Sequence, residues 1–303
     1  MRKMMFFVGV FFFVSFCSGI AHAAALKKTV AVSDFENKTN AAGAWQIGTG
    51  TADMLTDSLI QSGQFIVLER QALNAVLAEQ NLAASTRASK AGAGAQTGNI
   101  KKAQILVQGA VTEFEEEKSG GGQGLSLYGV SLHSRSATAH VAIIIRLIDT
   151  TTSQVLYSQR VEGDASSSGV GFSASVAGVG FGQDGFKKTP MGKATQMAID
   201  RAVQYIATQM GTIPWKGKVI KVDENSMILV NAGVQSGMAK GQVLRLSRPG
   251  ESVLDPDTGM ELGQEAKALG TVTVEEALDK YSKAKAVVLS SPAQAGDLLE
   301  ALQ

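Results

Sequence analysis

The feature that most constrains the fold of this chain is a strict alternation of apolar residues with small or polar ones. It occurs in two segments that interrupt an α/β pattern. The first run places Ala137, Ala139, Val141, Ile143, Ile145 and Leu147 on every second position. The second does the same with Val170, Phe172, Ala174 and Val176, and no residue from Gly169 to Gly182 is charged. Because successive side chains of a strand point to opposite faces, both runs predict strands with one apolar face.

The two segments, residues 115–147 and 162–189, can each form an out-and-back pair of strands. Each arm has roughly the 9–11 residues that a tilted membrane strand needs. The side chains expected to face lipid are Val141, Ile143, Ile145, Val170, Phe172 and Val176. Four strands cannot close a barrel, so several copies would have to share one. The alternative is a pair of glycine-rich loops that stay in solvent.

Residues 1–23 have the order of a secretory signal peptide. A short basic start precedes an apolar run and an Ala-His-Ala motif that ends at Ala23 and matches an A-x-A cleavage site. Cleavage there removes Cys17, the single cysteine, which excludes disulfides and cysteine-ligated metals from the mature chain. The bulky Phe16 before Cys17 does not fit a lipoprotein signal, and lipid anchoring is kept as the less favoured alternative.

Residues 24–212 alternate strand and helix signals. Apolar runs near Lys28, Phe65 and Ile105 predict strands. The spacing of apolar residues predicts a helix that ends near Gly63 and another from Lys193 to Met210. We therefore expect an α/β or α+β domain in which helices pack on one sheet. From residue 213 to 303 only strand-like runs and turns remain, which predicts a small all-β module resembling a barrel.

Neither catalysis nor a cofactor is indicated. The net charge of +1 does not suit nucleic-acid binding. The residues from Gly180 to Gly185 fit G-x-G-x-x-G, but the acid that a dinucleotide site requires, Asp200, would lie inside a predicted helix. His133 and His140 flank a predicted turn, so two ordinary imidazoles are favoured over a metal pair. We expect no enzyme, no cofactor and no metal, and a cell-envelope enzyme ranks last among the alternatives.

Several stretches resemble the curli secretion channel family (CsgG/HfaB). They are Thr51 to Gln80, Ile105 to Val130 and Val141 to Ser158, and the most specific parts are FIVLERQ (Phe65 to Gln71) and KSGGG (Lys118 to Gly122). More faintly, NAGVQSGMAKGQVLRLSRPGE in the last 100 or so residues resembles the C-terminal domain of the flagellar assembly protein T family. The second resemblance implies a module that docks an envelope partner.

The first resemblance implies an ungated outer-membrane channel. In that family a periplasmic α/β domain carries two β-hairpins, which combine around a homo-oligomeric ring, nonameric by the resemblance, into one barrel that passes unfolded amyloid subunits. The constriction loop of the family corresponds to residues 40–48, so Asn40, Trp45 and Gln46 are the candidate neck residues. Packing of Trp45 in the core is an equal alternative.

Departures from the family keep a second function open. Its members are usually lipoproteins, its constriction loop is longer, and the return arm of the second hairpin here carries Lys187, Lys188 and Pro190, which suit a membrane strand poorly. The leading hypothesis is an outer-membrane secretion channel subunit with its bulk in the periplasm. The alternative is a periplasmic or peripheral outer-membrane assembly or scaffold protein of the same fold without an inserted barrel.

Overall fold

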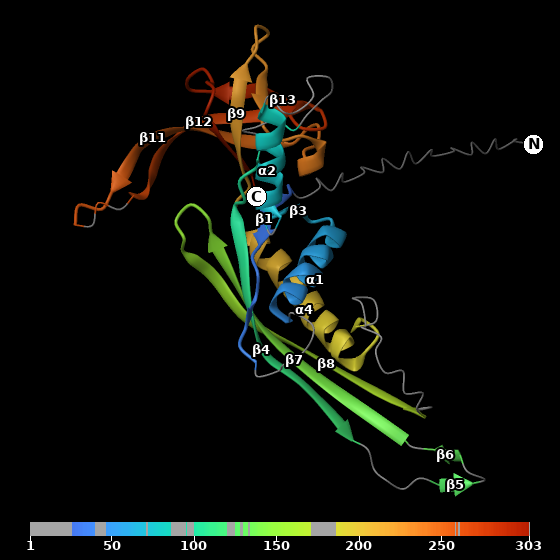
Figure 1. Cartoon of the computed structure of the whole chain (residues 1–303). Coiled ribbons are helices and arrows are strands. Elements are labelled where there is room, and N and C mark those ends of the chain that lie inside the picture. Colours follow the sequence, from blue (N-terminus) through green and yellow to red (C-terminus); the bar gives the residue numbers. More distant parts are fainter. Residues whose placement is uncertain are drawn as a thin grey trace, which may run out of the picture.

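The computed structural model describes residues 26–39, 47–70, 72–85, 95, 100–119, 125–127, 130–132, 134–170, 186–257, 259 and 261–302. These residues form a mixed α/β fold, in which a sheet with helices on one face is followed by a closed barrel (Figure 1). The predicted signal peptide, residues 1–23, lies outside the described residues. Among the described residues, no helix combines the length and apolar character needed to cross a bilayer.

The first sheet has the strand order β3-β1-β4-β7-β8, with β2 beside β4. The strands are β1 (Lys28–Val32), β2 (Glu36–Asn37), β3 (Phe65–Leu68), β4 (Ile105–Ser119), β7 (Ser134–Asp149) and β8 (Val155–Val170). β1 runs parallel to β3 and β4, whereas β4, β7 and β8 are antiparallel to one another. The predicted strand signals are therefore confirmed, and the Thr/Ser turn after Asp149 joins β7 to β8.

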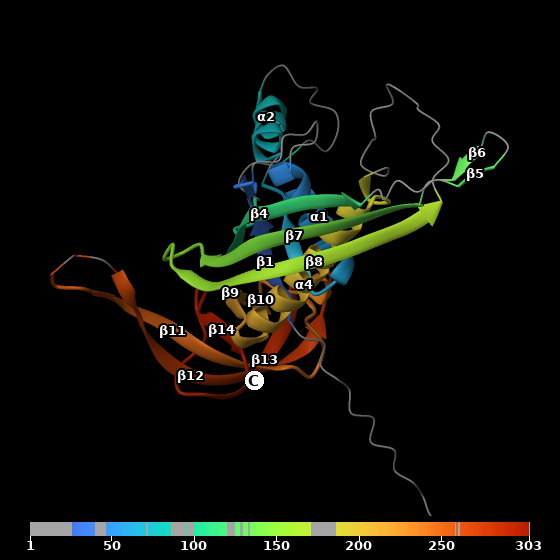
Figure 2. The same ribbon diagram turned by 90° about the horizontal axis from the view of Figure 1, so that it is seen from below.

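Helices α1 (Ile47–Ser62) and α4 (Pro190–Thr212) pack on one face of this sheet (Figure 2). α1 ends where Gly63 adopts a φ of 64°, a left-handed conformation that favours glycine after a helix. Thr189 caps the N-terminus of α4, and its hydroxyl accepts a hydrogen bond from the Gly192 N–H at 3.0 Å. The predicted apolar stripe of α4 is buried at Ile199, among other positions.

α4 approaches β8 closely because position 163 is a glycine. A Cβ on Gly163 would lie 2.0 Å from the carbonyl oxygen of Ala194 and 2.6 Å from the Ala198 nitrogen, both in the backbone of α4. The helix therefore rests directly on the strand. Buried residues of β7, α1 and α4 make one continuous apolar core beneath the sheet.

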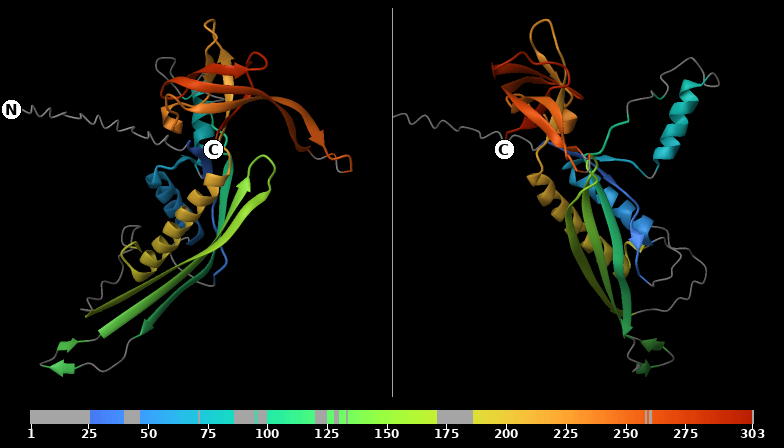
Figure 3. Two further views of the ribbon diagram at one scale, coloured as in Figure 1. Left: turned by 180° about the vertical axis from the view of Figure 1, so that it is seen from behind. Right: turned by 90° about the vertical axis from the view of Figure 1, so that its left-hand side faces the viewer.

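Helix α2 (Leu73–Ala84) contributes nothing to that core, since none of its residues is buried. Its side chains Val76 and Leu77 are 42% and 40% exposed. Figure 3 shows the helix standing apart from both the sheet and the barrel.

The strands of the C-terminal part close into a barrel in the order β10-β13-β12-β11-β14-β9. They are β9 (Lys216–Val222), β10 (Ile228–Val230), β11 (Val243–Leu254), β12 (Glu261–Ala277), β13 (Ser282–Leu289) and β14 (Leu298–Ala301), with a short 3₁₀ helix η1 (Val234–Ser236) after β10. A second apolar core, separate from the first, fills the barrel with side chains such as Leu244, Leu246 and Val272. The far ends of β11 and β12 project from it as a ribbon (Figure 1).

The start of the described chain is attached to the barrel before it enters the sheet. Leu26 packs against the barrel core, and the Lys27 N–H donates to the Ser236 carbonyl at 2.9 Å. The ammonium group of Lys28 then donates to the carbonyl of Met210 near the end of α4. A cation at this position suits the negative end of the helix dipole.

Three strands of the first sheet continue past the helices. The core reaches Phe114 on β4, Ala139 on β7 and Ala165 on β8. Beyond it β4 and β7 remain paired to Ser119, and β7 and β8 remain paired to Val170. A separate two-stranded ladder, β5 (Leu125–Leu127) with β6 (Val130–Leu132), follows β4. The projecting strands point away from the barrel in Figure 1.

Candidate functional site on the outer face of the sheet

The outer face of β4, β7 and β8, opposite the helices, carries a polar network. On β7 and β8, His140 is paired with Asp164 in the antiparallel ladder, so that both side chains point to the same face. On β4 the register shifts between Val111 and Glu113. In a regular strand these two residues would share the core face, and the extra residue turns Glu113 to the outer face instead.

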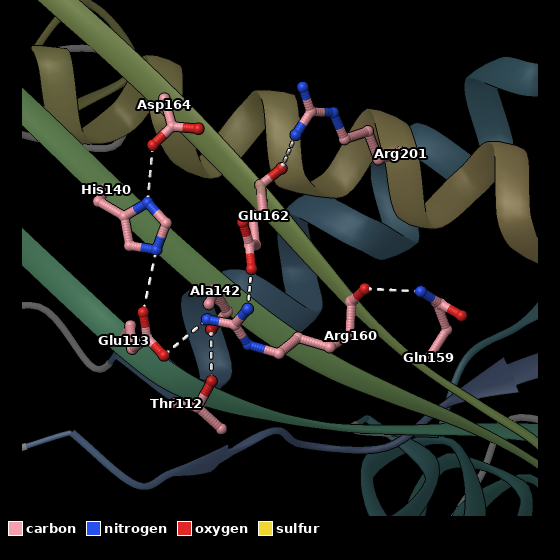
Figure 4. Close-up of polar contacts among 9 residues, drawn as sticks. All are labelled: Thr112, Glu113, His140, Ala142, Gln159, Arg160, Glu162, Asp164 and Arg201. Atoms are coloured by element: carbon pink, nitrogen blue, oxygen red, sulfur yellow. Dashed lines mark hydrogen bonds and ion pairs between the residues drawn. The ribbon is translucent and has the colours of Figure 1, made fainter.

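His140 stands between two carboxylates that come from different strands. Its Nδ1 lies 2.7 Å from Asp164 Oδ1 on β8, and its Nε2 lies 3.0 Å from Glu113 Oε2 on β4 (Figure 4). Arg160 donates to the other oxygen of Glu113 at 2.6 Å and also forms an ion pair with Glu162. Side chains of the three strands are thereby joined into one chain of charged hydrogen bonds.

The network favours the charged form of its members. The hydrogen bond from Arg160 lowers the pKa of Glu113 below its ordinary value, although burial opposes the change. The hydrogen bond to Asp164 raises the pKa of His140 above 6.5, again against burial, and Glu113 adds to the effect. A protonated histidine and an ionised glutamate therefore stabilise each other at this site.

An open cavity of about 370 Å³ adjoins the network where the strands leave the core. It is lined by Glu115, Glu117, Thr138, Ala139, His140, Asp164, Ala165 and Ser166. Among the described residues, no group of three or more histidine, cysteine, aspartate or glutamate side chains has the arrangement of a metal site. The geometry suits a structural or protonation role at the base of the projecting strands.

Three residues that we expected to face lipid lie in the protein core. Val141, Ile143 and Ile145 are each 0% exposed and pack among buried residues of α1 and α4. This corrects the expectation for these three positions. The physical reason is that the helices already cover the apolar face of β7 from Ala139 to Leu147, so that these three side chains do not face a bilayer.

Comparison with known proteins identifies the family. Residues 16–227 match the family described as curli production assembly/transport component CsgG. The chain belongs to the CsgG family. A candidate lipoprotein of Neisseria meningitidis serogroup B is 25% identical over 197 residues, which cover 63% of this chain and 80% of that protein.

Two solved structures are similar to this CsgG family chain at low identity. A hypothetical protein of Chlamydia trachomatis aligns with a TM-score of 0.35 and 15% identity, over 60% of this chain and 96% of its own. A lipoprotein of Neisseria meningitidis aligns with a TM-score of 0.27 and 13% identity, over 61% of this chain and 99% of its own.

The other site residues expected from the alternation pattern or from the resemblance to the CsgG family remain predictions. Asn40, Trp45 and Gln46 of the neck, and Phe172 and Val176 of the lipid-facing set, lie outside the described residues. For Val170, the last residue of β8, the structure describes only the backbone.

Sequence reasoning did not find the polar network of this CsgG family member. It treated His140 as an ordinary imidazole and singled out neither Glu113 nor Asp164. The Thr/Ser turn between β7 and β8 pairs Ile148 with Val155, a register that would place position 163 opposite 140. A register shift between Leu147 and Ile148 brings Asp164 there instead. Glu113 reaches the network because of the bulge in β4, and no turn residue in the sequence predicts that bulge.

Proposed function

We propose that this chain is a subunit of an outer-membrane secretion channel. Copies would form a homo-oligomeric ring with most of each subunit in the periplasm, and unfolded, amyloid-type protein would pass to the cell surface. Membership of the CsgG family supports the proposal. The observation that carries it is the continuation of β4, β7 and β8, still paired, beyond the last helix-covered residues of the core.

The projecting strands meet a requirement of such a channel. Strands within lipid need every backbone group paired, so an open array must be completed by other copies. A head-to-tail ring whose rotation closes supplies that completion. Any membrane-embedded part would begin past Ala139 and Ala165, which leaves His140 and Glu113 on the periplasmic side of it.

Transport would be passive diffusion, without nucleotide hydrolysis or any enzymatic step. The neck is proposed at Asn40, Trp45 and Gln46, where an aromatic collar with amide neighbours would let a varied chain slide. The C-terminal barrel would dock an envelope partner. No cofactor is required for this mechanism.

Electron microscopy of detergent-extracted particles tests the ring. The chain, expressed with its signal peptide, should be found in outer-membrane fractions, and extracted particles should be rings with a central hole. A monodisperse monomer in detergent-free buffer that is absent from outer-membrane fractions would contradict the channel.

A charge scan tests insertion of the second hairpin. Phe172→Arg and Val176→Arg should each cost roughly 2–4 kcal/mol per subunit near the bilayer midplane and prevent insertion. Ser173→Arg, between them on the expected lumen face, is the matched control and should leave insertion intact. Equal tolerance of all three changes would indicate loops in solvent.

One observation favours a second candidate, a periplasmic or peripheral outer-membrane scaffold of the same fold. The most apolar part of the return arm of the first hairpin, which includes Val141, Ile143 and Ile145, belongs to the core. The part of β7 that projects beyond it, residues 134–138, reads SRSAT and is largely polar. A scaffold would remain soluble without detergent while retaining an envelope partner, and the fractionation described above separates the two candidates.

A further inference from the structure

We propose that His140 is a proton-operated clasp that ties β4, β7 and β8 together at the base of the projecting strands. While both ring nitrogens carry a proton, the imidazolium holds a carboxylate on each side. When the ring loses a proton, one of these two hydrogen bonds breaks and the base of the strands loosens. The inference does not depend on whether the strand tips enter a membrane.

The hydrogen-bond geometry requires the doubly protonated ring. A neutral imidazole has one N–H, and its other nitrogen can only accept. Ionised carboxylates also only accept. The two contacts of His140, at 2.7 Å to Asp164 and 3.0 Å to Glu113, are therefore both hydrogen bonds only when the ring is an imidazolium.

The protonated ring of His140 is a positive charge surrounded mainly by carboxylates. The charged side chains near His140 on this face are Glu113, Glu115 and Glu117 from β4 and Arg160, Glu162 and Asp164 from β8. The helices α1 and α4 pack on the opposite face, and from α4 the Arg201 guanidinium donates to the backbone carbonyl of Glu162 at 2.7 Å. Removal of the proton leaves carboxylates on both sides of a neutral ring, with Arg160 as the cation that still contacts Glu113.

The contact to Glu113 is the one expected to break. Glu113 keeps its hydrogen bond from Arg160 at 2.6 Å, so a neutral ring gains more by retaining its N–H toward Asp164. The lone pair of Nε2 would then face the Glu113 carboxylate, and the repulsion would separate β4 from β7. Asp164 also raises the pKa of His140 above 6.5, which sets the transition on the alkaline side of that value.

Loss of the hydrogen bond to Glu113 affects the projecting strands because the clasp lies at their base. His140 follows Ala139, the last buried residue of β7 on the side of the projecting strands. Inward of this point the helices hold the sheet, and outward of it the strands depend on their own ladder. Breaking the hydrogen bond to Glu113 therefore weakens the support of the projecting part and leaves the core intact.

Nitrogen spectroscopy on the wild-type protein is the direct test. In long-range ¹H–¹⁵N spectra of the mature chain, with His133→Gln to assign the signals, His140 should show two protonated nitrogens at pH 6 and a midpoint above 6.5. Glu113→Gln and Asp164→Asn should each lower that midpoint. A neutral single tautomer at pH 6, a midpoint at or below 6.5, or no response to either substitution would overturn the proposal.

Hydrogen exchange measures the mechanical consequence. After correction for intrinsic exchange rates, the amides of β4 from Glu113 to Ser119 should lose roughly tenfold protection when His140 deprotonates, as expected for loss of a charged hydrogen bond. His140→Gln should show the same protection at both pH values, and His133→Gln should behave like wild type. Wild-type protection that does not change across the His140 midpoint would overturn the clasp.

Discussion

Asp297 is a buried carboxylate whose partners come from two different parts of the barrel. Its oxygens accept hydrogen bonds from Arg248 at 2.9 and 3.0 Å and from the Gln294 N–H at 2.8 Å, and the residue is 2% exposed. Arg248 also donates to the Pro292 carbonyl. This group of contacts ties β11 to the loop before β14.

Removal of Asp297 should therefore destabilise the barrel. Asp297→Ala removes the buried carboxylate that accepts hydrogen bonds from Arg248 and the Gln294 N–H, and should cost roughly 1–3 kcal/mol, the range for removing one partner of a buried hydrogen bond. Glu276→Ala, which removes the exposed Lys283–Glu276 pair, is the control and should leave the denaturation midpoint almost unchanged. Equal losses in chemical denaturation of the two variants would contradict the role of burial.

The same carboxylate predicts the pH dependence of the barrel. Burial raises the pKa of Asp297, but the hydrogen bonds from Arg248 and Gln294 outweigh it, and the net pKa lies below 3.8. A lowered pKa in the folded state gives stability that is complete above 3.8 and is lost as the pH falls through the lowered value. Thermal melts from pH 5 to pH 2 should show this loss in the wild type and a smaller slope in Asp297→Asn.

At the scale of elements, β7 shows which structural features could be predicted from the sequence alone. The alternation from Ala137 to Leu147 predicted a strand and correctly divided its two faces. It could not tell which surroundings cover the apolar face, because a helix and a bilayer select the same side chains. The stripe of α4 was also predicted, but the packing of α4 on β8 depends on the close approach at Gly163, which is a tertiary feature.

Because the core part of β7 is buried under helices and is not exposed to lipid, truncation of one of its core side chains should destabilise the protein. Ile143→Ala should cost roughly 2–5 kcal/mol of unfolding free energy in detergent-free buffer, because it leaves a cavity in a filled core. Ile144→Ala, one residue further on and pointing to the outer face, should cost less. An Ile143→Ala variant as stable as wild type in chemical denaturation would place the side chain outside the core.

The contact of α4 with β8 is tested by adding one methyl group. Gly163→Ala pushes a Cβ into the backbone of α4 and should destabilise the protein by roughly 1–3 kcal/mol or more. Gly211→Ala, near the end of α4, meets no atom within 4 Å and should be stabilising by about 0.5–1 kcal/mol. Thermal unfolding of the two variants should therefore shift in opposite directions.

At the scale of the whole molecule, two apolar cores are joined by a short connection. One core lies between the first sheet and its helices, and the other fills the barrel. The sequence predicted a small all-β module resembling a barrel after residue 213, and the strands close into a barrel. The strand order could not be predicted, since β14 inserts between β9 and β11, which lie far from it in the sequence.

Two cores predict two unfolding transitions in calorimetry. Leu246→Ala in the barrel should lower one transition by an amount that corresponds to roughly 2–5 kcal/mol and leave the other in place. Ile199→Ala in α4 should do the reverse. A single transition that moves with either substitution would mean that the contacts of Leu26 and Lys27 with the barrel couple the two parts into one cooperative unit.

The place of β14 in the barrel has a consequence for biosynthesis. Residues 298–301 are translated well after β9 and β11, yet they fill the position between these two strands. Until they arrive, β9 and β11 have open edges that can pair with other chains. The nascent protein therefore passes through a period in which it is prone to pair with other chains, and that period ends only when β14 has been synthesised.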